Sequence, residues 1–190
     1  MRLKDKVAII TGGSRGIGFA TADAFLREGA KVAVAASSEK NAEAAVEKLK
    51  AIHPDAEVVG ISPNLGSFES VKEEFDKVEK QFGRIDILVN NAGVSESTPF
   101  TSYTEADFDR VIDLNVKGVF NATRAVVDGM IKNHSGVVLN TSSMVSISGQ
   151  PSGFAYPASK FAVNGTTISL ARELGPKGIR VNEQIAAIEA

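Results

Sequence analysis

Short runs of β-branched residues alternate with longer segments of helical periodicity along most of the chain, and this alternation limits the possible folds more than any other feature. The predicted strands are Val7–Ile10, Val32–Ala36, Val58–Ile61, Ile85–Val89 and Val137–Leu139. The predicted helices are Ile17–Glu28, Lys40–Ile52, Phe68–Phe82, Glu105–Ile131 and Ala158–Leu174. Uninterrupted apolar runs are typical of strands buried on both faces. The pattern predicts an α/β fold with a doubly wound parallel sheet.

Composition is that of one globular domain over residues 1–190, and it excludes several kinds of site. The chain is 43% hydrophobic and has 21 basic and 23 acidic residues, a balance that attracts neither nucleic acid nor an anionic membrane. With no cysteine and only two histidines, it has no thiol nucleophile, no disulfide and no multi-histidine metal centre. No apolar run approaches the length of a membrane span or signal sequence. We therefore expect a cytoplasmic protein without a membrane or nucleic-acid partner.

A glycine-rich turn, Thr11–Gly18, follows the first predicted strand and opens the first predicted helix. Glycines there allow a tight turn and let backbone N–H groups approach a pyrophosphate, which also meets the positive end of the helix. A plain turn would use glycines too, but the strand–turn–helix context favours a dinucleotide site. The candidate contacts in this turn are Gly12, Ser14, Arg15, Gly16, Ile17 and Gly18.

A second polar segment, Asn90–Gly93, directly follows the predicted strand Ile85–Val89. The carboxyl ends of parallel strands face the ligand crevice in an open α/β sheet. Amide and small side chains at such a position let a flat ligand lie close and offer it hydrogen bonds. Asn91, Ala92 and Gly93 are therefore further candidate cofactor contacts, although an ordinary turn after a buried strand would also explain them.

The third motif is Tyr156-Pro157-Ala158-Ser159-Lys160, with Ser143 thirteen residues before the tyrosine. Pro157 suits the first turn of a helix, so Tyr156 is expected at a helix start with Lys160 one turn further on the same face. A nearby ammonium favours the phenolate form of a tyrosine, which makes it a usable proton donor and acceptor. Ser143 follows the strand Val137–Leu139, so its hydroxyl is expected at the same sheet edge.

Together with Asn115 in the sequence Leu114–Gly118, these three motifs resemble the short-chain dehydrogenase/reductase family over the chain as far as Asn182. The resemblance implies a Rossmann fold and an NAD(P)-dependent oxidoreductase, with Tyr156 as general acid/base and Ser143 positioning the substrate carbonyl. It also implies that Lys160 tunes the tyrosine and binds the nicotinamide ribose, and that Asn115 kinks a long helix and anchors a proton-relay water. Within the family, the sequence is most similar to 3-oxoacyl-acyl-carrier-protein reductases and related carbonyl, sugar and steroid dehydrogenases.

The end of the second predicted strand bears on the choice of cofactor. NAD-binding members usually place there an acid that binds the ribose hydroxyl, but this chain has Ala36 followed by Ser37 and Ser38. With Arg15, these hydroxyls would offer donors and a cation to a 2′-phosphate. NADP is therefore favoured over NAD. After the third strand, where the family usually has an aspartate, Asn64 and the adjacent Leu65 complete the candidate contacts.

The leading hypothesis is an NADP(H)-dependent enzyme that interconverts a carbonyl compound and a secondary alcohol, both small molecules. A sugar-nucleotide epimerase would share the tyrosine–lysine pair, but its glycine turn is usually one residue shorter. A truncated or non-catalytic nucleotide-binding relative is the third hypothesis. The segments Val94–Phe100 and Ser146–Phe154 are expected to line the substrate pocket, and the substrate itself is left open.

Two further expectations concern the end of the chain and its assembly. The family ordinarily continues after Asn182 into a Pro-Gly turn, a substrate loop, a helix and a strand, whereas residues 183–190 are rich in Ala and Glu and predict helix. We therefore expect C-terminal elements to be missing, either by truncation or, as we favour, because a segment is absent after Asn182. The resemblance also implies a homodimer or homotetramer, with a candidate patch of Ala162, Val163, Thr166 and Ile168.

Overall fold

The computed structural model describes residues 1–186 of the chain. Its strands are β1 (Val7–Thr11), β2 (Lys31–Ala35), β3 (Val58–Ile61), β4 (Ile87–Asn90), β5 (Gly136–Ser143) and β6 (Ile179–Ala186). Its α-helices are α1 (Gly16–Arg27), α2 (Glu39–Ile52), α3 (Phe68–Phe82), α4 (Glu105–Ile112), α5 (Gly118–Lys132), α6 (Val145–Ser148) and α7 (Ala155–Leu174). A π-helical turn, Asp113–Lys117, joins α4 to α5.

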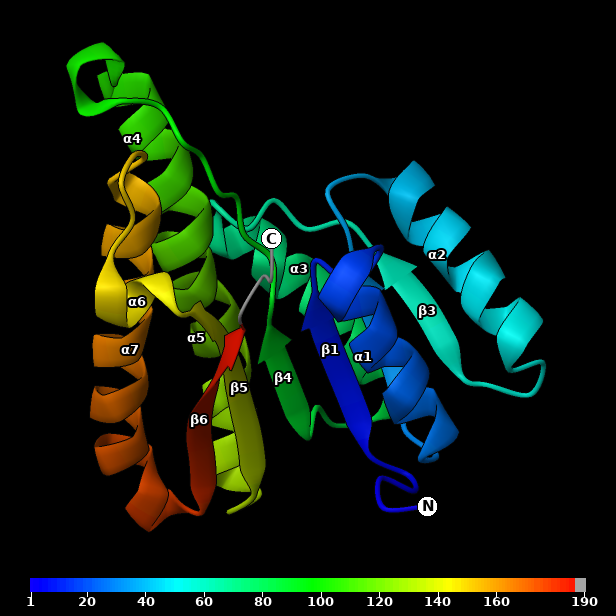
Figure 1. Cartoon of the computed structure of the whole chain (residues 1–190). Helices are drawn as coiled ribbons and strands as arrows, with labels where there is room; N and C mark the ends of the chain where they lie inside the picture. The colour runs from blue at the N-terminus through cyan, green and yellow to red at the C-terminus, as the bar shows by residue number, and fades with distance from the viewer. Residues whose placement is uncertain (187–190) are drawn as a thin grey trace.

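The six strands form one parallel sheet in the order β3-β2-β1-β4-β5-β6 (Figure 1). The chain moves outward from β1 in one direction as far as β3, then returns to continue from β4 on the other side of β1. This reversal between β1 and β4 is the place where a doubly wound sheet opens its ligand crevice. The predicted α/β fold is thus confirmed.

Each face of the sheet has its own apolar core. On one face, side chains of α3, α5 and α7 pack on the strands, with Phe75 and Met130 among the fully buried residues. On the other face, α1 and α2 cover β1, β2 and β3 through residues such as Leu26 and Leu49. The central strand β1 lies between the two cores and is buried throughout. Such two-sided burial explains why its sequence is continuously apolar.

The prediction of burial on both faces is wrong for the two strands β3 and β5. β3 lies at a sheet edge, and Gly60 in its middle is exposed. In β5 buried and half-buried residues alternate, because α5 and α7 cover one face while Val137 and Leu139 on the other face are only partly buried.

The helix predicted over Glu105–Ile131 is not continuous, because a π-helical turn divides it into α4 and α5. This turn contains Asn115, the residue at which the family resemblance implies a kink. The apolar periodicity of the sequence does not reveal this interruption. The interruption has a tertiary cause. Asn115 is buried inside the turn, and its side chain accepts a hydrogen bond from the Val94 backbone N–H in the loop after β4. π-Turns of this kind occur mostly as local insertions at functional sites.

The helix predicted for residues 183–190 is wrong as far as Ala186. Glu183–Ala186 continue β6 without interruption, and Asn140↔Glu183 and Ser143↔Ala186 are partners in the parallel ladder. Pairing with β5 therefore overrides the helical preference of Ala and Glu, which is a weak local tendency. Residues 187–190, the rest of this prediction, lie outside the described residues.

A ladder of buried polar side chains crosses the core beneath the carboxyl edge of the sheet. The Asn90 amide donates to Thr123 Oγ1 of α5 (3.1 Å) and to Asn140 Oδ1 of β5 (2.9 Å). The Asn140 amide donates in turn to Thr167 Oγ1 of α7 (2.8 Å). All four side chains are buried, so this polar ladder ties α5, β4, β5 and α7 together.

The described residues contain no helix that combines the length and the apolarity needed to cross a bilayer.

Candidate active site

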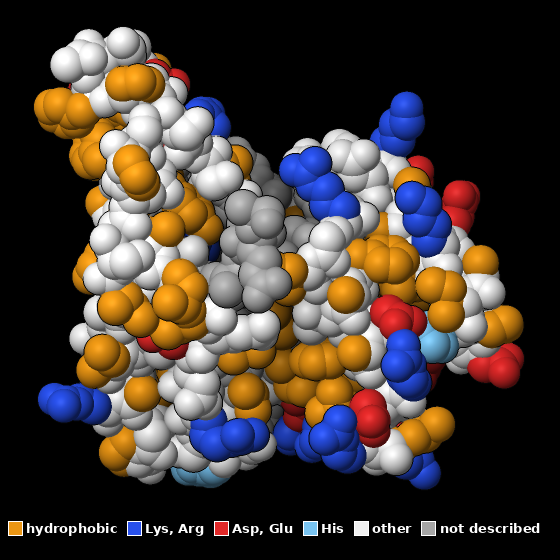
Figure 2. Space-filling model, in the orientation of Figure 1, with side chains coloured by type: hydrophobic (Ala, Val, Ile, Leu, Met, Phe, Trp, Pro, Cys, Tyr) orange, Lys and Arg blue, Asp and Glu red, His pale blue; other side chains and the backbone are white. Residues whose placement is uncertain are grey.

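A cavity of about 880 Å³ opens at the carboxyl edge of the sheet. In the orientation of Figure 2, the upper edge of the molecule is notched between the α4 side and the α1–α2 side. The predicted contacts that line the cavity are Gly12, Ser14, Arg15, Gly16, Ile17, Ser37, Asn64, Leu65, Asn91, Ala92 and Gly93. Loops after β1, β2, β3 and β4 thus meet at one site. Four other residues predicted as cofactor contacts are not among its lining residues: Gly18, Ser38, Tyr156 and Lys160.

The glycine turn has the geometry of a cradle for a ligand. Gly12 and Gly16 have φ of +65° and +54°, which side-chain-bearing residues rarely adopt. A Cβ on Gly18 would lie 2.3 Å from the Gly12 carbonyl oxygen, so this glycine serves packing within the turn. A Cβ on Gly16, in contrast, would project into open space beside the cavity.

Helix α1 begins at this turn and presents its positive end to the cavity. Its N-cap residue, Arg15, makes no side-chain capping hydrogen bond, and the first turn contains no acidic residue. Backbone donors at such a helix start, together with the helix dipole, suit an anionic group such as a pyrophosphate. The residues present therefore fit the phosphates of a dinucleotide.

The segment after β4 is fixed against the glycine turn by Thr11 and Asn91. Thr11 Oγ1 accepts hydrogen bonds from the backbone N–H groups of Asn91 and Ala92, both at 3.0 Å. The Asn91 amide donates back to the carbonyl oxygens of Thr11 and Gly12, both at 3.2 Å. A Cβ on Gly12 would lie 2.9 Å from Ala92 Cα, so the two segments are in direct contact. Asn91 thus supports the cavity floor with its side chain.

The adenosine side of the cavity contains cations but no acid. Arg15 and Lys48 line it, and no carboxylate is present among the described residues that do so. Ala36 stands at the position where NAD-binding members of the family usually have an acid, and it is buried at 6% exposure. Ser38 caps α2 by accepting from the Asn41 backbone N–H (3.3 Å), and Asn64 Oδ1 accepts from the Gly66 N–H (3.0 Å). These two side chains therefore stabilise the backbone at the rim.

Tyr156 and Lys160 lie one helical turn apart at the start of α7, as predicted. Lys160 Nζ is 5.6 Å from the centre of the Tyr156 ring and donates a hydrogen bond to the Thr141 carbonyl oxygen of β5 (2.7 Å). The lysine is 6% exposed, and burial lowers the pKa of its ammonium to about 8. Within the described chain no carboxylate pairs with it.

Asn115 connects the π-helical turn to both the cavity and α7. Its Oδ1 accepts from the Val94 N–H, and its amide donates to the Val94 carbonyl oxygen, both at 2.9 Å. The same amide donates to Ser159 Oγ (3.0 Å), which in turn donates to the Tyr156 carbonyl oxygen (2.7 Å). A Cβ on Gly93 would lie 3.2 Å from Asn115 Oδ1 and 3.8 Å from Lys160 Nζ. The four predicted side chains Asn115, Ser143, Tyr156 and Lys160 therefore belong to elements that meet at the Gly93 end of the cavity.

Ser143 occupies the last position of β5, two residues beyond the carbonyl that holds Lys160. It is 8% exposed, and its Oγ accepts from the Val145 backbone N–H (3.4 Å). Its hydroxyl can still donate to a ligand, because this contact uses it only as an acceptor.

The two segments predicted to flank the substrate lie against each other. The Gly153 N–H donates to the Thr98 carbonyl (3.0 Å), and Ser152 Oγ donates to the Ser97 carbonyl (2.6 Å). Four aromatic rings gather beside them. Phe154 contacts the rings of Phe100, Tyr103 and Phe108 at centroid distances of 5.1, 5.0 and 5.9 Å. The two segments therefore lie beside an aromatic group that consists of Phe100, Tyr103, Phe108 and Phe154.

Sequence reasoning missed Thr11, Ser159 and Lys48. Thr11 and Ser159 act through buried hydrogen bonds to Asn91 and Asn115, and only their positions beside motif residues could have pointed to them. Lys48 lies in the middle of α2, far in sequence from every motif, and only the packing of α2 beside the glycine turn brings it to the cavity.

The chain matches known dehydrogenases and reductases over nearly its whole length. Residues 6–188 match the family model for short chain dehydrogenases. The chain is 53% identical to a 3alpha-hydroxysteroid dehydrogenase of Mediterraneibacter gnavus, over 96% of this chain and 73% of that protein. It is 41% identical to the 3-oxoacyl-[acyl-carrier-protein] reductase FabG of Thermotoga maritima, with the same coverage.

Solved structures agree with this assignment. An NAD⁺-bound xylitol dehydrogenase and a levodione reductase both superpose with a TM-score of 0.94, at 34% and 36% identity. Each match covers 98% of this chain and 72% of the other. With its glycine turn, its Tyr156–Lys160 pair and these relatives, the chain belongs to the short-chain dehydrogenase/reductase family of NAD(P)-dependent oxidoreductases.

Proposed function

We propose that the protein interconverts a ketone and a secondary alcohol with NADP(H), and that Tyr156 is the general acid/base. The observation that carries this proposal is the buried Lys160 ammonium, held by the Thr141 carbonyl beside the Tyr156 ring at the Gly93 end of the cavity. A buried cation without a carboxylate partner favours a negatively charged form of a group next to it. Lys160 thus has the environment needed to promote proton transfer at Tyr156 Oη.

In the reduction, one hydride and one proton add to the substrate carbonyl. The hydride, which forms the new C–H bond, would come from a nicotinamide cofactor when one is bound. Tyr156 Oη donates its proton to the carbonyl oxygen, while the Ser143 hydroxyl positions that oxygen. Lys160 stabilises the phenolate left behind and binds the nicotinamide ribose. Oxidation reverses each step, with Tyr156 as the base.

Asn115 is proposed to position the site and to anchor a water that relays the proton. Its side chain already makes hydrogen bonds to Val94 and Ser159. These contacts tie the segment after β4 to α7 next to Tyr156.

NADP is proposed over NAD because the cavity is lined by Arg15 and Ser37 but, among the described residues, by no carboxylate. A 2′-phosphate carries close to two negative charges near neutral pH and is stabilised by such a set. NAD is the alternative, since a related xylitol dehydrogenase is NAD⁺-bound. Competition between the two cofactors in kcat/KM decides the question.

For the substrate, we propose a ketone or secondary alcohol on an apolar ring system of the hydroxysteroid type. The 53% identity with a 3alpha-hydroxysteroid dehydrogenase exceeds the 41% with FabG, and the aromatic group around Phe154 offers apolar contact area. A 3-oxoacyl thioester is the second candidate, on the strength of the FabG relatives. Turnover of 3-oxo- and 3-hydroxysteroids against 3-oxoacyl thioesters and sugar alcohols tests the choice.

The test of the general acid uses the two tyrosines of the chain. We expect Tyr156→Phe to lower kcat by about 10²–10⁴-fold, the usual contribution of general acid–base catalysis. NADPH affinity, measured by fluorescence titration, should change little because the ring is retained. Tyr103→Phe is the matched control, because it also removes one tyrosine hydroxyl and keeps the ring, in the segment between β4 and α4. Equal activity in the two variants would show that Tyr156 is not the acid.

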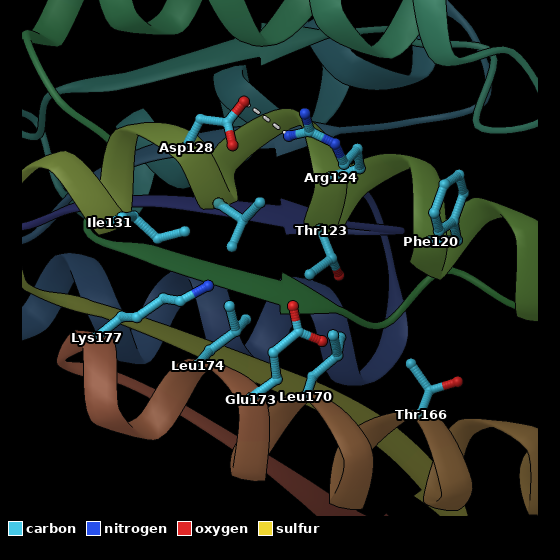
Figure 3. Close-up of a pocket in the computed structure, with 11 residues that line it drawn as sticks. Phe120, Thr123, Arg124, Asp128, Ile131, Thr166, Leu170, Glu173, Leu174 and Lys177 are labelled. Atoms are coloured by element: carbon cyan, nitrogen blue, oxygen red, sulfur yellow. Dashed lines mark hydrogen bonds and ion pairs between the residues drawn. The ribbon is translucent and has the colours of Figure 1, made fainter.

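A homodimer or homotetramer is proposed through a groove between α5 and α7 (Figure 3). Figure 3 shows Leu170 and Leu174 of α7 facing α5 across this groove, with Phe120 at one end. Phe120 is 58% exposed and Ile168 of α7 is 57% exposed, so both helices present apolar side chains. Val163, predicted as part of this patch, is buried at 2% exposure and cannot contribute to it.

Light scattering should give a mass above 20.0 kDa, the mass of one chain. Phe120→Ser should lower it, whereas Phe100→Ser, at an exposed ring outside the groove, should not. A monomeric wild-type protein would refute the assembly.

A further inference from the structure

One face of α2 lines the cavity beside the glycine turn. Asn41, Ala44, Ala45 and Lys48 are the α2 residues among its walls. Their spacing of three, four and seven residues places them on a single side of the helix. The two alanines leave room, and the amide and the ammonium stand at either end of this face.

The Lys48 ammonium has no ionic partner within residues 1–186. Positions three and four residues away on α2 are Ala44, Ala45, Ala51 and Ile52, none of which carries charge. In α3, by contrast, Lys72 and Lys77 each pair with a carboxylate of their own helix. Lys48 therefore presents an uncompensated positive charge to the cavity.

Lys48 lies about 10 Å further along α2 than Asn41, and the lean of its side chain directs its charge back toward the end of β2. Side chains of an α-helix lean toward its N-terminus, so the Lys48 side chain extends along Ala44 toward Asn41. Asn41 in turn donates to Ser37 Oγ (3.4 Å), which lies between β2 and the start of α2. Arg15, on the glycine turn, also lines this cavity.

We propose that Lys48 determines cofactor specificity by binding the 2′-phosphate of NADP, together with Arg15. This inference rests on the proposed use of NADP(H). The pyrophosphate is assigned to the start of α1 and the nicotinamide to the Gly93 end, so the 2′-phosphate is the remaining anion of the cofactor. Two cations from separate elements match its charge of nearly −2.

The experiment separates the 2′-phosphate from the rest of the cofactor by using two fragments, 2′,5′-ADP and 5′-AMP. Calorimetric titration of the wild-type protein should show tighter binding of 2′,5′-ADP. Lys48→Met should weaken 2′,5′-ADP binding about tenfold, or about 1.4 kcal/mol, and leave 5′-AMP binding unchanged. Lys48→Glu should weaken 2′,5′-ADP binding further, because its carboxylate repels the phosphate.

Lys50→Met is the matched control, because Lys50 is an exposed lysine of the same helix that does not line the cavity. It should leave both affinities unchanged. If Lys48→Met and Lys48→Glu keep the wild-type preference for 2′,5′-ADP, or weaken both fragments equally, the role of Lys48 is refuted. If the wild-type protein itself binds the two fragments equally, the proposed choice of NADP fails instead.

Discussion

Replacing Ser159 by alanine tests whether the hydrogen bonds behind Tyr156 serve catalysis or only stability. Ser159 is completely buried, accepts from the Asn115 amide at 3.0 Å and donates to the Tyr156 carbonyl at 2.7 Å. Ser159→Ala removes both contacts and leaves one amide N–H of Asn115 buried without a partner. Such a loss costs about 1–3 kcal/mol of unfolding free energy. For a chain of this size, each kcal/mol lowers Tm by about 2–4 °C.

The same helix offers a control with matched hydrogen bonding. Thr167 is also buried, accepts from the Asn140 amide (2.8 Å) and donates to the Val163 carbonyl (2.8 Å). Thr167→Val should therefore destabilise the protein by a similar amount, but about three helical turns away from Tyr156.

The assay measures Tm, kcat, KM and the pH profile of kcat for both variants at a temperature where each is folded. We expect Ser159→Ala to lower kcat by about tenfold and to move the pH profile, because Tyr156 and the Gly93 end of the cavity lose their common support. Thr167→Val should keep the wild-type kcat and profile. Equal losses of kcat in the two folded variants would refute a positioning role for Ser159.

Three further substitutions test other parts of the structure. Gly18→Ala should abolish dinucleotide binding and lower Tm, since its Cβ would lie 2.3 Å from the Gly12 carbonyl oxygen; unchanged binding in a titration would contradict the packing role. Ala36→Asp should shift the ratio of kcat/KM from NADP toward NAD, because the carboxylate repels a 2′-phosphate and accepts from a 2′-hydroxyl; a constant ratio would refute the ribose assignment. His53, followed by Arg27, holds the pKa of Asp23 below its usual range. The resulting stabilisation is present above the ordinary carboxyl pKa and is lost as pH falls through the lowered value. In urea unfolding, the free energy of unfolding of Asp23→Asn should therefore fall less at acidic pH than that of the wild-type protein.

Much of the fold follows from local pattern, because buried parallel strands and amphipathic helices each leave a clear periodicity. β3 was predicted with its observed bounds over Val58–Ile61, as was α3 over Phe68–Phe82. The local pattern gives the wrong secondary structure where a contact with a residue distant in sequence determines it. Asn115 produces a π-helical turn through its hold on Val94, and β5 draws Glu183–Ala186 into a strand against their helical preference.

The candidate site shows the same division. Motif residues at strand ends were predicted because topology brings all such ends to one edge of a parallel sheet. Gly18 and Ser38 belong to the motifs and yet serve local packing and capping, a distinction that requires interatomic distances. Lys48 reaches the cavity only through the packing of α2 beside the glycine turn, which no local pattern encodes.

The polar ladder through Asn90 and Asn140 fixes the register in which β5 pairs with β4. If β5 slipped by one residue against β4, the Asn140 side chain would turn to the opposite face of the sheet. The Asn90 amide and the Thr167 hydroxyl would then both lose their hydrogen bonds to it. An apolar strand pair would tolerate that slip far better, since one buried methyl group resembles another. The register of β5, and with it the position of Ser143 at the end of that strand, is therefore set from below by amide pairing. The loops that face the substrate could then be exchanged for others without disturbing the alignment of Ser143.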